Sequence, residues 1–366
     1  MFSLIKPLLF KTDPEFAHNL AIKSLKFNFI PHNFFRVENE EMLQTTIFGK
    51  KFANPIGLAA GFDKSAEVYQ SLFKFGFGFI EVGTVTPLKQ SGNPKPRIFR
   101  LEDDEALINR LGFNNDGSEV IRERILSNKS KISGILGVNI GPNKNTENQQ
   151  NDFLICLKSF IDIADYITIN ISSPNTEKLR DFHEEERLIS LIQSINLEKK
   201  NLKSNIPIML KISPDINEKL TEQISGIALQ NFISSLIISN TSNLNRNNLN
   251  DIQKNETGGL SGKPMEEISN KLIKNFYKNL KGKVPIIGVG GIDSGKSAYD
   301  KFLAGASLVQ LYTGMVYRGP KIIKKIKEEI IFQLKNDGVK NYSELIGQGS
   351  LTDIWKKRKK FNKIES

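Results

Sequence analysis

The chain has 366 residues, 39% hydrophobic and 25% charged, which is ordinary for a folded protein and allows either two average domains or one large barrel. One cysteine, Cys156, excludes an intramolecular disulfide framework, and with three histidines and no Cys/His cluster we expect no protein-bound metal. The net charge of +11 suits an anionic membrane, an acidic substrate or nucleic acid, or reflects a composition rich in Lys and Asn with no partner. We expect no nucleic acid partner, because the basic residues are mostly scattered and no known binding module accompanies them.

The first 40 residues look different from the rest. No apolar run reaches the roughly 20 residues that span a bilayer, and no signal-peptide cleavage site follows. Thr12 or Asp13 can cap a helix that begins at Pro14. Its apolar residues share one face: Phe16, Ala17, Leu20, Ala21 and Leu25. With lysines between the apolar segments, the pattern predicts a pair of helices on a membrane surface, and the alternative is a helix packed onto its own domain.

After residue 40 the chain alternates between strands and helices. Residues 45–55, "TTIFGKKFANP", predict a hairpin that turns at Gly49-Lys50. Eight short apolar runs follow, at 55–61, 77–85, 135–141, 166–172, 206–213, 235–241, 284–292 and 307–313. Helical stretches separate most of them, and in "NDFLICLKSF" the helical spacing predicts that Cys156 is a buried structural thiol.

Parallel strands covered by helices give an α/β fold, and eight regular units favour a closed (β/α)8 TIM barrel over a doubly wound open sheet. We therefore expect three parts: an N-terminal helical extension (1–40), a barrel (41–340), and a C-terminal helical segment with a basic tail (341–366).

The segment Gly290–Ser297, "GGIDSGKS", matches the phosphate-loop pattern of nucleotide triphosphatases. Those proteins carry the loop early, and a later strand ends in a magnesium-binding Asp. Here the segment follows the seventh strand, and the only later strand ends without a carboxylate. We interpret the match as a barrel phosphate site, since barrels often bind phosphate after strands seven and eight.

The predicted strand ends carry amides, hydroxyls and lysines that would converge at one end of the barrel. They are Ala60, Gly61, Lys64, Thr84, Asn139, Asn170, Ser173, Asn175, Lys211, Asn240 and Thr241. A single Asn or Thr can simply satisfy a strand end. Lys64 and Lys211 would be costly to bury without an anion, and the glycine-rich loop 257–262 permits close approach of the backbone to a ligand. The set suits a heteroaromatic ligand.

Several segments together resemble the signatures of the dihydroorotate dehydrogenase family, in the family's order and over residues 50–335. They are "AAGFDK" (59–64), "EVGTVTP" (81–87), "GNPKPRIFRL" (92–101), "NRLGFNN" (109–115), "NISSPNT" (170–176), "GGLSGKP" (258–264), "IIGVGGI" (286–292) and "QLYTGMVYRGP" (310–320). The chain is most similar to the membrane-associated, quinone-using class 2. That class has a serine where class 1 has a cysteine, here Ser173, and an extension motif similar to residues 13–21.

The resemblance implies FMN-dependent oxidation of dihydroorotate to orotate in pyrimidine biosynthesis. Ser173 would remove the C5 proton while a hydride leaves C6 for the flavin N5, and Thr176 and the shielding ring of Phe113 match the positions of the proton relay. The implied substrate residues are Lys64, Asn109, Arg110, Leu111, Gly112, Phe113, Asn170, Asn175, Asn240 and Thr241. The implied FMN residues are Ala60, Gly61, Lys64, Thr84, Asn139, Asn170, Lys211, Ser239, Gly262, Gly291, Tyr312 and Thr313.

The same resemblance implies that electrons leave through a tunnel under the N-terminal helices to a membrane quinone. His18, Arg100 and Tyr312 match tunnel positions, whereas Leu9 stands where some relatives have a polar quinone contact. We expect a monomer bound peripherally to the cytoplasmic face of a bacterial inner membrane.

Three rival functions remain open at this point. A class 1 enzyme would lack the extension and carry Cys at 173. Another FMN barrel, such as a hydroxy-acid oxidase, would show a catalytic His after a late strand. A non-catalytic flavin- or phosphate-binding protein would hold FMN without turnover.

Overall fold

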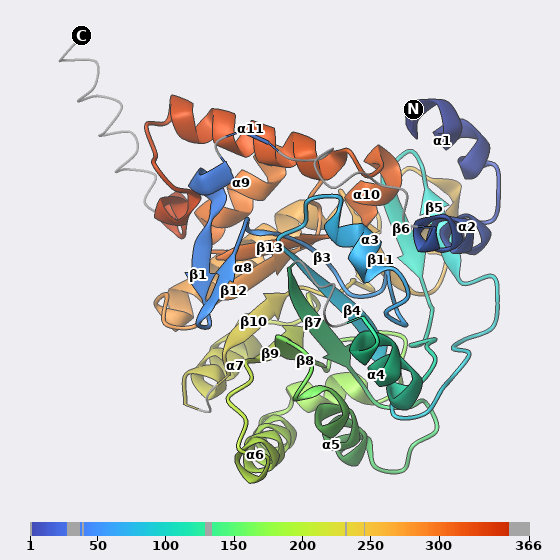
Figure 1. Cartoon of the computed structure of the whole chain (residues 1–366), viewed down its shortest axis with the longest axis vertical. Coiled ribbons are helices and arrows are strands. Elements are labelled where there is room, and N and C mark those ends of the chain that lie inside the picture. Colours follow the sequence, from blue (N-terminus) through green and yellow to red (C-terminus); the bar gives the residue numbers. More distant parts are fainter. Residues whose placement is uncertain are drawn as a thin grey trace.

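A computed structural model describes residues 2–27, 37, 38, 40–128, 134–230, 233–244 and 246–350. Residues 28–36 of the expected extension and the basic tail beyond residue 350 lie outside these ranges. Within them, eight parallel strands close into a barrel in the order β10-β12-β13-β3-β4-β7-β8-β9 (Figure 1). The strands are β3 (Ile56–Leu58), β4 (Phe79–Val85), β7 (Ile135–Ile140), β8 (Tyr166–Asn170), β9 (Ile208–Ile212), β10 (Ser235–Ile238), β12 (Ile286–Val289) and β13 (Leu308–Leu311). Each lies within one expected run, so the TIM barrel is confirmed and the open sheet is wrong.

Helices cover the outside of the barrel, as Figure 1 shows. They are α3 (Tyr69–Phe73), α4 (Ser118–Leu126), α5 (Gln149–Phe160), α6 (Glu185–Asn201), α7 (Glu218–Gln230), α8 (Met265–Leu280), α9 (Gly295–Ala304), α10 (Thr313–Arg318) and α11 (Ile322–Asn336), with short 3-10 turns η1 (Glu40–Leu43), η3 (Leu179–His183), η4 (Ile252–Asn255), η5 (Tyr342–Leu345) and η6 (Gln348–Ser350). Cys156 on α5 is fully buried, and burial raises the pKa of its thiol, which confirms a structural role. Within the described part of the chain, no helix has the length and apolar character needed to cross a membrane.

A small hairpin closes the amino-terminal end of the barrel. It consists of β1 (Thr45–Ile47) and β2 (Lys50–Phe52), and Ile47 pairs with Lys50. The two turn residues are therefore Phe48 and Gly49, at φ 57° and 70°, and the expected turn at Gly49-Lys50 is wrong by one residue. A two-residue hairpin turn of this hand needs positive φ at both positions. Phe52 packs edge to face on Phe79, with ring centroids 5.6 Å apart.

The barrel interior is layered, because alternate residues of each strand point inward. The lowest layer is an apolar floor made of Phe52, Phe79, Tyr166, Met209, Ile237, Ile287 and Leu308. Two residues further along five of these strands, the buried residues are polar: Glu81, Thr168, Lys211, Ser239 and Gln310. The floor thus seals one end of the barrel, and the polar layer lies between the floor and the carboxyl ends of the strands.

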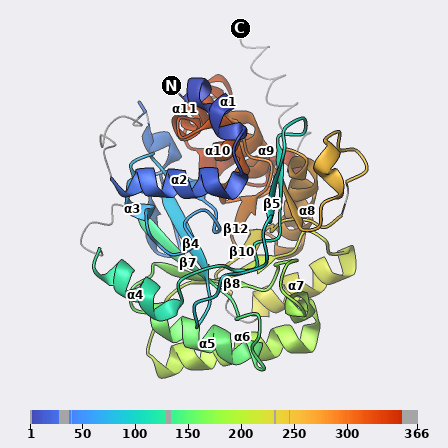
Figure 2. The same ribbon diagram turned by 90° about the vertical axis from the view of Figure 1, so that its right-hand side faces the viewer.

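The N-terminal extension forms two helices, α1 (Phe2–Phe10) and α2 (Pro14–Lys26), which lie in front of the barrel in Figure 2. The Asp13 carboxylate caps α2 by accepting a 2.8 Å hydrogen bond from the backbone N–H of Phe16, as expected for one of the two candidate caps. Helix α2 buries Glu15 and Ile22, whereas Phe16 and Leu20 on the expected apolar face are 58% and 43% exposed. The helix packs on its own domain, with Leu25 of the expected apolar face against the main core, and still leaves Phe16 and Leu20 exposed.

A second sheet, absent from the sequence-based prediction, stands beside the mouth of the barrel. Its antiparallel strands β5 (Ile98–Leu101), β6 (Ala106–Asn109) and β11 (Gly259–Gly262) run in the order β11-β6-β5. The expected glycine-rich loop 257–262 is therefore largely strand β11. Glycine is needed there because a Cβ on Gly262 would lie 2.5 Å from the carbonyl oxygen of Glu105. β5 contacts α2, so this sheet connects the extension to the barrel.

The apolar floor generates a stability prediction. A Cβ added to Gly137 on β7 would lie 2.0 Å from Cζ of Tyr166, whose ring fills the floor. Gly137→Ala should therefore destabilise the protein by about 1–3 kcal/mol or more, since a packed core does not absorb an added methyl group. Chemical denaturation measures this change.

Gly226→Ala is the matched control. Gly226 lies in α7 with nothing within 4 Å of an added Cβ, so the change should be neutral or stabilise the helix by up to about 1 kcal/mol. Equal effects of the two substitutions would contradict the account of the floor.

Candidate active site

A cavity lies above the polar layer, at the carboxyl ends of the barrel strands. Of the residues expected at a site, it is lined by Ala60, Gly61, Lys64, Thr84, Asn109, Leu111, Gly112, Phe113, Asn170, Ser173, Asn175, Lys211, Ser239, Asn240, Thr241 and Tyr312. Closure of the barrel and the β5-β6-β11 sheet bring these residues together from positions up to 252 apart in sequence (312 − 60). Ile98, Leu107 and Met265 add apolar walls that the sequence did not suggest.

Arg110, expected to contact the substrate, and Thr176, expected in the proton relay, do not line this cavity. The guanidinium of Arg110 donates to Glu256 Oε2 at 2.8 Å and lies 4.5 Å from the ring centre of Phe99. Thr176 lies half-buried on the loop after β8, three residues beyond Ser173. The side chain of Arg110 is therefore occupied elsewhere, whereas its backbone directly follows β6, between the cavity residues Asn109 and Leu111.

The cavity is connected downward to a row of buried amides. Asn139 is fully buried, and its Oδ1 accepts from Thr84 Oγ1 at 2.6 Å and from Asn170 Nδ2 at 3.2 Å. Asn170 Oδ1 in turn accepts from Asn240 Nδ2 at 3.3 Å. Asn139 thus acts through Thr84 and Asn170 rather than as part of the cavity wall.

Ser173 is a buried residue on the cavity wall, and its Oγ accepts a 3.2 Å hydrogen bond from the backbone N–H of Asn175. That contact orients the hydroxyl lone pairs. Phe113 has a φ of 54° and packs where a Cβ on Gly141 would come within 2.9 Å of its ring. The ring therefore lies on the cavity wall near Thr84.

Two lysines bring positive charge to the cavity. Burial lowers the pKa of Lys64 to about 8 and also lowers the pKa of Lys211. Among the described residues, neither ammonium group has a hydrogen-bond acceptor, so both are available to an anionic ligand. A planar ring that carries negative charge fits this donor set better than a neutral ligand does.

A smaller cavity next to the first is lined by the remaining expected cofactor residues: Gly262, Gly291 and Thr313, with Tyr312 shared. A Cβ on Gly291 would lie 2.4 Å from Cα of Glu266, and one on Gly314 would lie 2.2 Å from the carbonyl oxygen of Ile292. Only glycine fits this backbone, which exposes peptide N–H groups as anion-binding sites do. Together, the two adjoining cavities fit an anionic ring with a phosphate tail, as in FMN.

Aromatic rings connect the first cavity to helix α2. His18 contacts Phe62 edge to face at 5.0 Å, and Phe62 contacts Tyr312 at 5.8 Å. Burial, with a smaller contribution from the charge of Lys64, lowers the pKa of His18 to about 3, so its imidazole is neutral near pH 7. Phe62 was missed as a site residue, although it lies within "AAGFDK".

Arg100 lies at the other end of the extension. Its guanidinium donates to the carbonyl oxygens of Phe10 at 3.0 Å and Thr12 at 2.8 Å, and lies 4.9 Å from the ring centre of Phe10. It thereby holds the connection between α1 and α2. Leu9 is half-buried in the last turn of α1.

A buried ion pair, which the sequence did not suggest, attaches α2 to the cavity wall. The guanidinium of Arg97 donates to both Glu15 carboxylate oxygens, at 3.0 and 2.7 Å, and also to the carbonyl oxygens of Ser91 and Asn93. Asn93 Nδ2 donates to the carbonyl oxygen of Arg110 at 2.9 Å. The extension and the loops around the cavity are therefore one connected unit.

The comparisons with known proteins agree with this geometry. The family model for dihydroorotate dehydrogenase matches residues 42–334. A dihydroorotate dehydrogenase (quinone) of Idiomarina loihiensis is 46% identical over 333 residues, which cover 89% of this chain and 99% of that protein. A dihydroorotate dehydrogenase (quinone) of Bartonella tribocorum is 47% identical over 342 residues, which cover 92% of this chain and 93% of that protein. The crystal structure of DHODH from Eimeria tenella in complex with ferulenol has a TM-score of 0.89 and 37% identity, covering 94% of this chain and 98% of that one. The chain belongs to the dihydroorotate dehydrogenase family, in its class 2.

Proposed function

We propose that this chain oxidises dihydroorotate to orotate and passes the electrons to a quinone. The observation that carries the proposal is the meeting of Ser173, four asparagines and two buried lysines in one cavity beside a glycine-lined anion cradle. When bound, FMN supplies the two-electron acceptor that this chemistry requires. Family membership and the names of the relatives support the reaction.

Ser173 is the proposed base for the C5 proton. A serine hydroxyl is a weak base, so it needs a pocket that excludes water and a path for the proton. Its burial and the ring of Phe113 support the first requirement. Thr176, on the same loop, is the proposed participant in the second, and the ring of Phe113 would shield that path.

The cavity residues divide between the two ligands by their chemistry. Amides pair with the imide edges of a pyrimidine, and an ammonium group opposes a carboxylate. The proposed orotate residues are Lys64, Asn109, Leu111, Gly112, Phe113, Asn170, Asn175, Asn240 and Thr241, with Arg110 through its backbone. The proposed FMN residues are Ala60, Gly61, Lys64, Thr84, Asn139, Asn170, Lys211, Ser239, Gly262, Gly291, Tyr312 and Thr313. Lys211 would oppose negative charge on the reduced ring.

His18, Arg100 and Tyr312 are the proposed quinone residues. The ring series from Tyr312 through Phe62 to His18 leads from the cavity toward α2 and supports a route on that side. Arg100 would act at the α1–α2 connection, where it already binds the backbone.

Anaerobic addition of dihydroorotate should bleach the flavin absorbance of the wild-type holoenzyme, and a quinone should restore it. Ser173→Ala should slow the bleaching by about 10²–10⁴-fold, the usual contribution of a positioned base, while orotate still binds. Stopped-flow absorbance measures the bleaching rate.

Each rival function has its own outcome in this experiment. Recovery with fumarate or NAD but not with quinone would indicate class 1 behaviour. A wild-type flavin that binds orotate but never bleaches would indicate a binding protein. Unchanged bleaching in Ser173→Ala would remove Ser173 as the base.

Orotate affinity should depend on pH through Lys64. Its pKa of about 8 lies below the usual value, so its ammonium form is complete only below that pH and is lost as the pH rises. We expect the affinity for orotate to fall between roughly pH 7 and pH 9.5, toward about tenfold per unit above the pKa. Isothermal titration of the holoenzyme measures this. Lys64→Met should bind more weakly and without this pH dependence, and an equal slope in both proteins would contradict the assignment.

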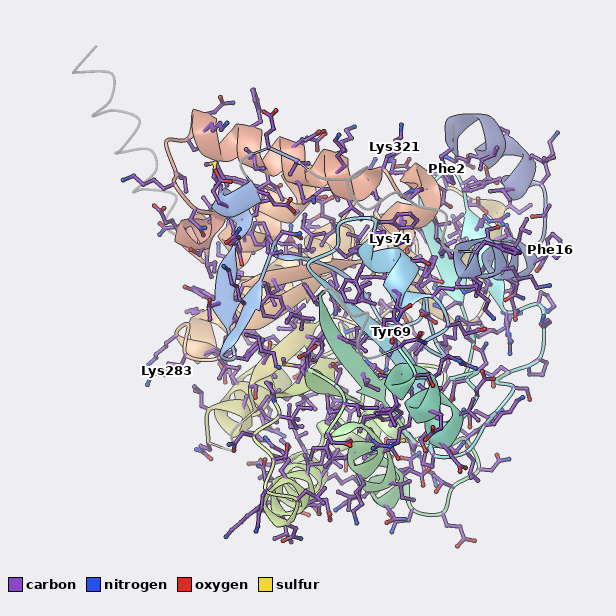
Figure 3. The ribbon with its side chains drawn as sticks, viewed as in Figure 1. Phe2, Phe16, Tyr69, Lys74, Lys283 and Lys321 are labelled. Atoms are coloured by element: carbon purple, nitrogen blue, oxygen red, sulfur yellow. The ribbon has the colours of Figure 1, made fainter. Side chains whose placement is uncertain are left out.

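The extension is the proposed site of membrane association. Leu8 on α1 and Phe16 and Leu20 on α2 are large apolar residues exposed to solvent, with Lys11 and Lys23 near them in sequence. Figure 3 shows Phe16 at the outer edge of the molecule. Exposed apolar side chains with interspersed lysines support peripheral binding to an anionic bilayer. We propose that the protein lies as a monomer on the cytoplasmic face of a bacterial inner membrane.

The double substitution Phe16→Ser and Leu20→Ser should reduce cosedimentation with anionic phospholipid vesicles several-fold, because it removes apolar surface available to the bilayer. Leu197→Ser is the matched control, since Leu197 is 61% exposed on α6, away from the extension. Equal losses, or none, would contradict membrane binding through α2.

A further inference from the structure

Glu81 is a fully buried carboxylate in the polar layer of the barrel, and nothing in the proposed chemistry uses it. Oε1 accepts from Asn139 Nδ2 at 2.7 Å. Oε2 accepts from the hydroxyl of Tyr166 at 3.2 Å, from Thr168 Oγ1 at 3.1 Å and from Gln310 Nε2 at 3.0 Å. Four convergent donors are what an ionised carboxylate needs in a low-dielectric interior. Burial and the neighbouring Glu81 charge also raise the pKa of Tyr166, which keeps its phenol a donor.

Glu81 determines which way the Asn139 amide faces. An ionised carboxylate only accepts hydrogen bonds, so Asn139 must turn its NH₂ toward Glu81 and its Oδ1 toward the cavity. There Oδ1 accepts from Thr84 Oγ1 at 2.6 Å. With Asn139 flipped, two amide NH₂ groups would face each other, because Asn170 Nδ2 lies 3.2 Å from Oδ1.

The orientation of the Asn139 amide also fixes the orientation of the amides on the cavity wall. Since the Thr84 hydroxyl proton is used on Asn139, its oxygen accepts from Asn170 Nδ2 at 2.9 Å. Asn170 must then present Oδ1 to Asn240 Nδ2, at 3.3 Å, and to the hydroxyl of Ser172, at 2.9 Å. Asn240 Oδ1 in turn accepts from the N–H of Thr241 at 2.7 Å. Every bond in this series points the same way, from Asn240 down to Glu81.

Glu81 also acts on Lys211. Burial lowers the pKa of Lys211, and the negative charge of Glu81 opposes that shift and favours the ammonium form. One carboxylate below the cavity therefore supports both the amide orientation and the charge that the cavity presents.

We propose that Glu81 is a positioning residue for the substrate: it fixes the donor and acceptor sides of the Asn139, Asn170 and Asn240 amides and thereby the cavity's recognition of the pyrimidine imide edges. Glu81 itself does not line the cavity, so it acts through these amides. The inference rests on the proposed function, in which Asn170 and Asn240 hold orotate.

A charge swap tests the inference. In Glu81→Gln the new amide can present either N or O to Asn139, so the direction is no longer imposed. In Asn139→Asp two carboxylates face each other. In the double variant, the amide introduced at position 81 donates to the carboxylate introduced at position 139, which can only accept, and the direction above it is restored. Each FMN-loaded protein is titrated with orotate, and the dissociation constant is read from the shift in flavin absorbance.

We expect each single variant to bind orotate about tenfold more weakly or worse, as for the loss of a charge-assisted hydrogen bond, and the double variant to recover most of the loss. FMN retention and the thermal midpoint, measured alongside, separate a folding defect from a binding defect. The inference would be overturned if the losses of orotate affinity from the two single substitutions multiply in the double variant. It would also be overturned if Glu81→Gln leaves the orotate dissociation constant unchanged. A wild-type protein that binds no orotate would instead overturn the proposed function.

If Glu81→Gln does not fold, Thr84→Val provides the test, because it removes the hydroxyl that connects Asn139 to Asn170 and so relates their amide orientations. It should weaken orotate binding, whereas Thr221→Val, which removes a hydroxyl from another buried threonine, on α7, should not. Equal orotate affinity in these two variants would also overturn the inference.

Discussion

In a closed parallel barrel, alternate side chains of every strand point into one enclosed interior. The rest of this structure depends on how these interior side chains pack and pair. The floor of this interior is apolar and depends on two glycines, Gly57 and Gly137, that leave room for the rings of Phe79 and Tyr166. The next layer is polar and would be costly to bury if its groups did not pair with one another. Glu81 makes that layer self-consistent, because four neutral donors reach it from three other strands.

The site therefore lies on a packed polar layer. Its specificity depends on which way each amide group faces as well as on where the amide lies. Asparagine offers a donor and an acceptor of nearly the same shape, so an amide site discriminates only if each amide is held one way. In this protein a single ionised group at the bottom of the series supplies that constraint. The lysines add charge without hydrogen-bond partners among the described residues, which leaves them free for an anionic ring or carboxylate.

Polar contacts attach the extension in addition to the burial of Ile22 in the main core. Arg97 binds Glu15 and the carbonyl groups of the loop beside the cavity, and Arg100 binds the carbonyl groups at the α1–α2 connection. Buried pairs of this kind are costly to break, since one charge would be left without a partner. They hold α2 in place while Phe16 and Leu20 stay on its outer side, so the helix can meet a second surface without leaving the barrel.

The sequence by itself determined the eight barrel strands, the buried thiol of Cys156 and most of the residues around the cavity, and it narrowed the α2 cap to Thr12 or Asp13. Short apolar runs, capping residues and polar strand ends are local patterns. The sequence placed the hairpin turn one residue late and missed the β5-β6-β11 sheet, whose strands are only four residues long. Only the tertiary structure decided that Arg110 turns toward Glu256, that α2 packs by the side of Ile22, and that Arg97 pairs with Glu15, 82 positions away. The sequence shows Glu81 as a single acidic residue within the apolar run "FIEVGTV". Its four hydrogen-bond donors come from strands distant in sequence. A local pattern cannot show which distant groups will meet, and hydrogen-bond direction depends on all of them at once.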